Sequence, residues 1–202
     1  MYPIEFYNHW LGIGTLLLQI ISVLMLALFL MRKYFPQLEG AYAHHRIAEE
    51  LLRKWGLWIA LVVAVFSVAM TLFYSEVLGI APCSLCWLQR IFLYPQVILF
   101  AVALWKRDRS IADYSIALSI FGGIIALYQH YLQMGGTSVV PCPATADKAV
   151  DCGVRFLFEF NYITYPLMSA TLFAFLIVLM LFVRARRDPS LLSYTPNDQV
   201  NK

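Results

Sequence analysis

Residues 57–90 read LWIALVVAVFSVAMTLFYSEVLGIAPCSLCWLQR. The first 19 residues of this stretch, 57–75, carry no charge and are long enough to cross the hydrocarbon layer of a bilayer as a helix. A Cys-X-X-Cys pair and an arginine then stand where the next apolar run begins. A helix starting near Pro82 would place Cys83, Cys86 and Arg90 on one face, because their offsets are three, four and seven. A dithiol at the edge of an apolar solvent suggests electron exchange with a lipid-soluble carrier.

The rest of the chain has the composition of an integral membrane protein. Of its 202 residues, 61% are hydrophobic and 13% are charged, against about 25% charged in an average soluble domain. Further uncharged runs cover 10–31, 114–134 and 162–183, and a fifth run, 87–105, carries only Arg90 as a charge. Each can span a layer of about 30 Å at a rise of about 1.5 Å per residue. We predict an all-α integral membrane protein, a four-helix transmembrane bundle with an additional N-terminal transmembrane helix.

The predicted spans divide the chain into three regions. Residues 1–56 hold the extra N-terminal helix and a cytoplasmic amphipathic segment, residues 57–183 form a four-helix redox domain, and residues 184–202 form a basic tail. The first apolar run is predicted to be a retained helix rather than a signal peptide. It has no basic region before it and no small-residue cleavage pattern after it.

Basic residues are concentrated on one side of the five predicted spans. Segment 32–56 holds five Lys and Arg, segment 106–110 holds three and the tail holds four, so twelve of the 15 lie on that side. The other side keeps Arg90, Lys148 and Arg155. Loops rich in Lys and Arg stay in the cytoplasm, which predicts an external N-terminus and a cytoplasmic C-terminus. The net charge of +3 is explained by this topology and implies no nucleic-acid partner.

All four cysteines fall on the predicted outer side. Cys83 and Cys86 lie between the second and third spans, and Cys142 and Cys152 lie in segment 135–161. Four cysteines allow three disulfide connectivities, which the sequence leaves open. An even number of cysteines on an oxidising side favours disulfide chemistry over free thiols.

Two alternatives to a redox role concern the Cys-X-X-Cys pair. A structural disulfide there closes a loop too short to restrict the unfolded chain much, whereas a helix N-terminus and Arg90 both favour the reactive thiolate. A four-cysteine metal site needs a matching second half, but nine residues separate Cys142 from Cys152. We therefore predict a redox pair and no metal.

Segment 135–161 is predicted to be a loop. Glycine or proline at positions 135, 136, 141, 143 and 153 argues against one continuous helix. A mobile loop suits a thiol pair that must meet a partner protein and also reach the pair at the membrane edge. A static disulfide in an ordinary loop is the alternative.

These motifs resemble the disulfide bond formation protein B (DsbB) family, including its shorter Gram-positive relatives called BdbC. The resemblance covers residues 57–183, with Cys-X-X-Cys-X-X-X-Arg opening the second of four helices. A His-X-Leu-Gln element at 130–133 closes the third helix, a Pro-flanked cysteine pair follows, and Ile-Thr-Tyr-Pro at 163–166 opens the last. The spacing of the loop cysteines is shorter than in the best-known enterobacterial members, and residues 1–56 lie outside the resemblance.

The resemblance implies a protein-dithiol:quinone oxidoreductase in the bacterial cytoplasmic membrane. Such enzymes reoxidise a DsbA-like thioredoxin-fold protein on the outer side and pass the electrons to ubiquinone or menaquinone. Cys83 and Cys86 would form the quinone-facing disulfide, with Cys86 engaging the ring and Cys83 exchanging with the loop. Cys142 would be attacked by the partner, Cys152 would be its disulfide mate, and Arg90 would stabilise negative charge on the quinone oxygens.

Three further residues are candidate contacts of the quinone head group: Trp87, His130 and Gln133. For His130 and Gln133, a satisfied polar pair at a helix end is an equal alternative. A vitamin K epoxide reductase-like enzyme is a rival, but in that family the loop pair precedes the Cys-X-X-Cys, the reverse of the order here. A non-catalytic membrane protein with two structural disulfides is the rival from another functional class.

Overall fold

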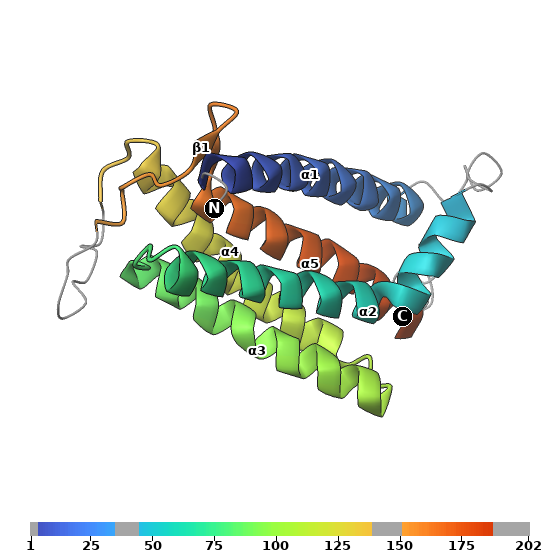
Figure 1. The fold of residues 1–202 in the computed structure, drawn as a ribbon. Coiled ribbons are helices and arrows are strands. Elements are labelled where there is room, and N and C mark those ends of the chain that lie inside the picture. Colours follow the sequence, from blue (N-terminus) through green and yellow to red (C-terminus); the bar gives the residue numbers. More distant parts are fainter. Residues whose placement is uncertain (1–3, 35–44, 139–150, 188–202) are drawn as a thin grey trace.

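The computed structural model describes residues 4–34, 45–138 and 151–187 of the chain (Figure 1). In this part of the chain, five helices are long and apolar enough to cross a membrane. They are α1 (Ile4–Tyr34), α2 (His45–Leu72), α3 (Ser84–Lys106), α4 (Ile111–Gln133) and α5 (Tyr165–Arg187). The prediction of an all-α membrane protein is confirmed.

Helix α5 is the centre of the bundle. Of its most apolar stretch 67% is buried, against 22–33% in the other four helices. It packs against α4, α2 and α1, while α3 packs against α2 and α4. Figure 1 shows α1 along one edge of the bundle and α3 along the opposite edge. The helix that sequence reasoning set apart from the four-helix unit is thus packed on its central helix.

A glycine lets α4 and α5 approach closely. The ring of Phe173 on α5 lies over Gly122, where an added Cβ would overlap it. At the neighbouring Gly123, an added Cβ would lie 3.6 Å from the Phe173 Cβ, an ordinary contact distance. Since Phe173 is fully buried, its ring has little room to move aside.

A short β-hairpin precedes α5. Strands β1 (Phe158–Glu159) and β2 (Ile163–Thr164) pair antiparallel. The last predicted span begins at residue 162, but the helix begins at Tyr165, after the hairpin. Pro166 stands in its first turn, where a missing N–H costs no hydrogen bond. The Thr164 hydroxyl accepts a hydrogen bond from the Leu167 N–H at 3.4 Å and so helps to start the helix.

Helix α2 departs from a regular α-helix at both ends. Figure 1 shows its first turns running at an angle to the rest, and these turns include part of the segment predicted to be amphipathic. At its other end the chain widens into a π-helix, η2 (Phe73–Val77). Single π-helical turns are uncommon and frequent at functional sites.

The termini of the helices divide the structure into two chemically different ends. The starts of α1, α3 and α5 and the ends of η2 and α4 lie at one end, together with Cys83, Cys86 and the hairpin (Figure 1). The other end carries basic side chains, including Lys106 and Arg184, the latter paired with Asp113 at 3.1 Å. All cysteines within the described residues therefore lie away from the basic end.

We predict that Gly122→Ala destabilises the protein and that Gly123→Ala does not. Both changes favour the helix to the same extent, so only the overlap with the Phe173 ring separates them. Overpacking of this kind costs about 1–3 kcal/mol, and thermal unfolding in detergent should show a lower midpoint for Gly122→Ala alone. Equal midpoints for the two variants would contradict the close packing of α4 on α5.

Candidate functional site

The Cys-X-X-Cys pair occupies the first turn of α3. Cys83 is the N-cap residue, with an extended backbone (φ −73°, ψ 172°), and its carbonyl oxygen accepts a hydrogen bond from the Trp87 N–H at 3.1 Å. Cys86 therefore lies in the first turn, where unpaired backbone N–H groups give a partial positive charge. The prediction that a helix begins near Pro82 is confirmed, and this position favours a thiolate on Cys86.

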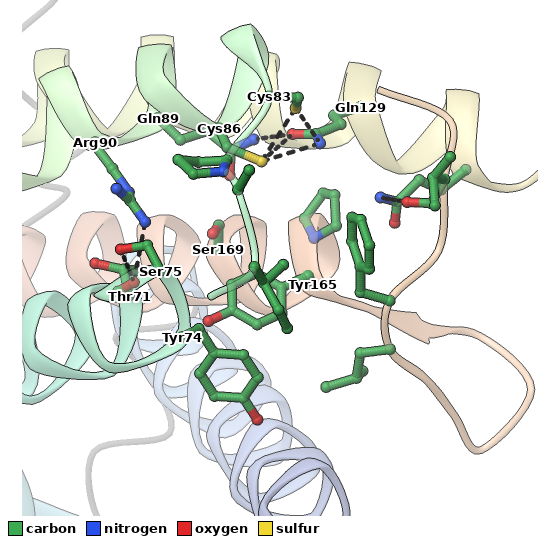
Figure 2. Close-up of a pocket in the computed structure, with 18 of the residues that line it drawn as sticks. Thr71, Tyr74, Ser75, Cys83, Cys86, Gln89, Arg90, Gln129, Tyr165 and Ser169 are labelled. Atoms are coloured by element: carbon green, nitrogen blue, oxygen red, sulfur yellow. Dashed lines mark hydrogen bonds between the residues drawn. The ribbon is translucent and has the colours of Figure 1, made fainter. Parts of the chain in front are cut away.

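The side-chain amide of Gln129 on α4 joins the two cysteines. Its Nε2 donates to Cys83 Sγ at 3.2 Å and to Cys86 Sγ at 3.3 Å. Its Oε1 accepts from Gln89 Nε2 at 2.6 Å, which fixes the orientation of the amide. Figure 2 shows this amide against both sulfur atoms. Gln129 thus holds the pair together and provides an N–H donor for negative charge on sulfur.

The two thiols of the pair are not equivalent. Cys83 donates a hydrogen bond to Cys86 Sγ at 3.2 Å, and this bond, with burial as a second cause, raises the pKa of the Cys83 thiol. Cys86 receives that donor and the Gln129 N–H. A protonated Cys86 can donate in return to Gln129 Oε1, but only over 3.6 Å. Cys83 is thus the donor of the pair, and Cys86 is the sulfur that accepts two hydrogen bonds.

Arg90, one turn further along α3, is held by the widened end of α2. Its Nη2 donates to the carbonyl oxygen of Thr71 at 3.0 Å, and its guanidinium lies 5.1 Å from the centre of the Trp87 ring. The Thr71 hydroxyl is itself bonded to Tyr94 at 2.9 Å. Only 9% of Arg90 is exposed. A buried guanidinium needs such partners, since an unpaired charge in an apolar bundle is costly.

A small cavity of about 80 Å³ lies beside the cysteines and Arg90. Its wall is mostly apolar and is formed by the ends of α2, α3, α4 and α5 and by the chain before the hairpin (Figure 2). The polar and aromatic residues in the wall include Thr71, Tyr74, Ser75, Cys83, Cys86, Gln89, Arg90, Gln129, Gln133, Tyr165, Ser169 and Phe173. The predicted residues Cys83, Cys86, Arg90 and Gln133 are therefore brought together around one space.

Gln133 supplies an unused acceptor in this wall. Its Nε2 donates to the Val154 carbonyl oxygen at 2.9 Å, while its Oε1 is buried and has no hydrogen-bond partner among the described residues. Buried amide oxygens are nearly always paired. This oxygen is therefore available to accept a hydrogen bond in the cavity wall.

Of the loop cysteines, Cys152 lies within the described residues and Cys142 lies outside them. Cys152 is in a disulfide, whereas Cys83 and Cys86 are free thiols. Its Sγ is 3.8 Å from Ser84 Oγ, and Cys152 and Cys83 belong to one small cluster of buried apolar side chains that includes Leu132. Cys152 thus lies against the first turn of α3.

Two predicted contacts lie outside the cavity wall. The His130 ring bonds through Nδ1 to the Thr164 hydroxyl at 2.7 Å and so ties α4 to the start of α5. Trp87 is half exposed, and its ring contacts the site through the Arg90 guanidinium. In this structure His130 thus has a hydrogen-bond partner at the end of its helix, and its contact with a quinone stays a prediction.

Sequence reasoning missed Gln129, Gln89, Thr71 and Tyr74. One signal was available for the two glutamines: an amide in an apolar span is costly unless it is paired inside the bundle, and Gln129 stands one turn before Gln133. No pattern in the sequence pointed to Thr71, whose contribution is a backbone carbonyl beside a π-helix. Tyr74 looked like one of many interfacial aromatics.

We predict that Gln129→Leu slows the alkylation of Cys86 by about tenfold at mildly acidic pH. At that pH the alkylation rate follows the fraction of Cys86 present as thiolate. The substitution removes one charge-assisted hydrogen bond that stabilises this thiolate. Alkylation of Cys83 should set in only at higher pH than that of Cys86, since its thiol pKa is raised. Peptide mapping after iodoacetamide treatment measures both.

Gln96→Leu is the matched control, because Gln96 is a fully buried amide on α3 that bonds to Ser115 and Ser119 and not to sulfur. It should leave the alkylation rate unchanged. Equal rates for Gln129→Leu and the unmodified protein would contradict a role of the amide at the cysteines.

Comparison with known proteins agrees with the site. Residues 53–183 match the family described as disulfide bond formation protein DsbB.

The SPbeta prophage-derived disulfide bond formation protein B of Bacillus subtilis (strain 168) is 37% identical over 124 residues, covering 60% of this chain and 82% of the relative. A probable disulfide formation protein of Oceanobacillus iheyensis is 35% identical over 136 residues, covering 67% and 90%. Disulfide bond formation protein C of Bacillus subtilis is 29% identical over 135 residues, covering 65% and 94%. No solved structure matches the chain. With its cysteine pair, its membrane helices and this match, the chain belongs to the DsbB family of disulfide bond formation proteins.

Proposed function

We propose that this protein is a membrane dithiol:quinone oxidoreductase. It reoxidises a DsbA-like thioredoxin-fold protein and passes the electrons to ubiquinone or menaquinone, which sustains disulfide bond formation. The observation that carries the proposal is the placement of two free thiols and a buried arginine in the wall of one apolar cavity. Membership of a disulfide-forming family supports the same direction of electron flow, from protein thiols into the membrane.

The residues of the cavity fit a quinone head group. Quinone oxygens accept hydrogen bonds, and Arg90 offers donors; hydroquinone hydroxyls donate, and Gln133 Oε1 is an open acceptor. The rings of Tyr74, Tyr165 and Phe173 give an aromatic and apolar wall of the kind that covers flat ligands. When bound there, a quinone supplies a two-electron, two-proton acceptor.

The first half of the proposed reaction is two thiol–disulfide exchanges. A thiolate of the partner attacks Cys142, the Cys142–Cys152 bond breaks, and the second partner thiolate releases Cys142, so that the loop pair is reduced. Cys152 then attacks Cys83 in the oxidised Cys83–Cys86 disulfide and displaces Cys86 as a thiolate. Attack by Cys142 on Cys152 restores the loop disulfide and leaves Cys83 reduced, with two electrons on the Cys-X-X-Cys pair.

The positions of the described cysteines support this order. Cys152 lies against Ser84 and clusters with Cys83, so the exchange with the loop falls to Cys83. Cys86 accepts hydrogen bonds from Cys83 and Gln129, which stabilise the thiolate that this sequence of steps produces. Arg90 holds a positive charge in the same wall, where it stabilises negative charge on a bound ligand's oxygens.

The proposed orientation follows from charge. The basic end of the bundle faces the bacterial cytoplasm, as Lys- and Arg-rich segments do. The N-terminus and the end with Cys83, Cys86 and the loop pair then face the outer compartment, which is the oxidising side. A soluble thioredoxin-fold partner reaches the loop disulfide there, while the quinone enters from the membrane.

We predict that Arg90→Lys keeps a fraction of quinone turnover and that Arg90→Ala loses about a hundredfold or more in kcat, because a preorganised charge is worth roughly that much. The assay follows reduction of a short-chain ubiquinone and a short-chain menaquinone by a reduced thioredoxin-fold dithiol protein. Arg155→Ala is the control, since Arg155 packs on Phe158 outside the cavity. Near-normal rates for both Arg90 variants would remove Arg90 from the mechanism.

A second prediction concerns the partner-facing thiol. In Cys152→Ala, Cys142 has no disulfide mate, so its thiolate attacks the oxidised partner and remains joined to it. Acid quenching followed by non-reducing electrophoresis should reveal this mixed disulfide, and Cys142→Ala should abolish it. If the adduct persists in Cys142→Ala or never forms in Cys152→Ala, the assignment of Cys142 is wrong.

A further inference from the structure

Helix α1 lies outside residues 53–183, which match the family, yet it is bonded to the wall of the cavity. Asn8, in the second turn of α1, is 8% exposed, and its Oδ1 accepts a hydrogen bond from the Tyr74 hydroxyl at 2.7 Å. Tyr74 is 4% exposed and lines the cavity. Figure 2 shows the Tyr74 hydroxyl pointing away from the cysteines. Asn8 is thus one contact away from the cavity.

Tyr74 belongs to the most irregular part of the wall. It lies in η2, between Thr71, whose carbonyl oxygen holds Arg90, and the end of the second span. Its ring packs edge-on against that of Tyr165, with 5.1 Å between the ring centres, and Tyr165 also lines the cavity. A shift of the Tyr74 ring therefore also displaces the Tyr165 ring, and both rings line a cavity of only about 80 Å³.

Other contacts fix the register of α1 against the same end of the bundle. The ring of Tyr7 lies 5.5 Å from that of Phe73, the first residue of η2. Gly12 lies against the hairpin residues Glu159 and Phe160, so closely that an added Cβ would be crowded at 3.2 Å. A helix that only anchored the chain in lipid would need none of these, since lipid contact is not directional.

We propose that α1 contributes to the quinone site through Asn8. Asn8 is a positioning residue that holds the Tyr74 ring in its place in the cavity wall. This rests on the proposed quinone reaction and adds to it a residue outside the four-helix unit. Asn8 touches no reacting atom. It provides the buried Tyr74 hydroxyl with an acceptor on the far side of the ring, so that the ring presents its apolar face to the cavity.

Loss of that acceptor changes the wall in a specific way. A buried hydroxyl without a partner is unfavourable, and the Tyr74 side chain must turn until its hydroxyl finds another acceptor. That movement carries the ring away from its place beside Tyr165. The quinone is then bound less well, while exchange between the loop disulfide and the partner, at the other side of the first turn of α3, is unaffected.

The test measures KM and kcat for a short-chain ubiquinone, with a reduced thioredoxin-fold protein as the electron donor. Asn8→Leu should raise the quinone KM by about tenfold, the size expected from one buried hydrogen bond, with the KM for the dithiol protein unchanged. Asn8→Asp keeps an acceptor and should restore most of the affinity. Gln19→Leu is the matched control. Gln19 bonds α1 to Thr171 and Tyr162, neither of which lines the cavity.

A double-mutant cycle with Tyr74→Phe makes the inference specific. In Tyr74→Phe the hydroxyl that needs an acceptor is absent, so the ring should keep its place and Asn8→Leu should add little to the quinone KM in this background. Should Asn8→Leu fail to fold, Asn8→Ala, which removes the acceptor without adding bulk, takes its place. Equal effects of Asn8→Leu and Gln19→Leu would overturn the role of Asn8, as would an effect of Asn8→Leu that is as large in Tyr74→Phe as in the unmodified protein.

Quinone reduction by the unmodified protein distinguishes a failure of the proposed function from a failure of the role of Asn8. If it reduces no quinone at the expense of the dithiol protein, the proposed function fails and the cycle has nothing to measure. If it does, and Asn8→Leu matches it in quinone KM, only the positioning role of α1 is wrong.

Discussion

Inside an apolar helix bundle, a buried polar side chain must find its partner in the protein or in a bound ligand, because lipid supplies none. This constraint explains most of the site. The Gln129 amide is satisfied by Gln89 on one side and by two sulfur atoms on the other. The Arg90 guanidinium is satisfied by a carbonyl oxygen and an aromatic ring. These groups cannot be moved singly, so the cysteine pair and the charge beside it keep a fixed geometry.

The same constraint explains why the irregular backbone lies where it does. A π-helix and a hairpin expose backbone groups that a regular helix would pair, and both lie at the end of the bundle that carries the cysteines. The carbonyl oxygen of Thr71 accepts a hydrogen bond from Arg90, so the buried guanidinium has a partner in the cavity wall. Away from this end, helices α4 and α5 pack too closely for irregular backbone, as the Phe173 ring over Gly122 shows. The candidate site is therefore concentrated where the helices end.

The sequence allowed the architecture to be predicted because long apolar runs and charge asymmetry are properties of whole segments. It also placed Cys83, Cys86 and Arg90 on one helical face, since helical spacing alone fixes that. Gln129 and Tyr74 were not predicted, because their roles depend on which helices meet. A hydrogen bond from Gln129 to sulfur requires α4 beside α3, and one from Tyr74 to Asn8 requires α1 beside the end of α2. The hairpin before α5 was missed because Ile163 and Thr164 continue an apolar run without a break.

The first turn of α3 also gives the cysteine pair a direction. Cys83 keeps its proton, donates it toward Cys86 and lies in the cluster that contains Cys152. Cys86 takes the Cys83 and Gln129 donors, lies one turn from Arg90 and faces the cavity. Both cysteines line the cavity, and Cys83 also lies in the buried cluster with Cys152, so the first turn of α3 adjoins both the loop cysteine and the cavity. In the proposed reaction, a disulfide between Cys83 and Cys86 passes two electrons from the loop to the cavity within this one helical turn.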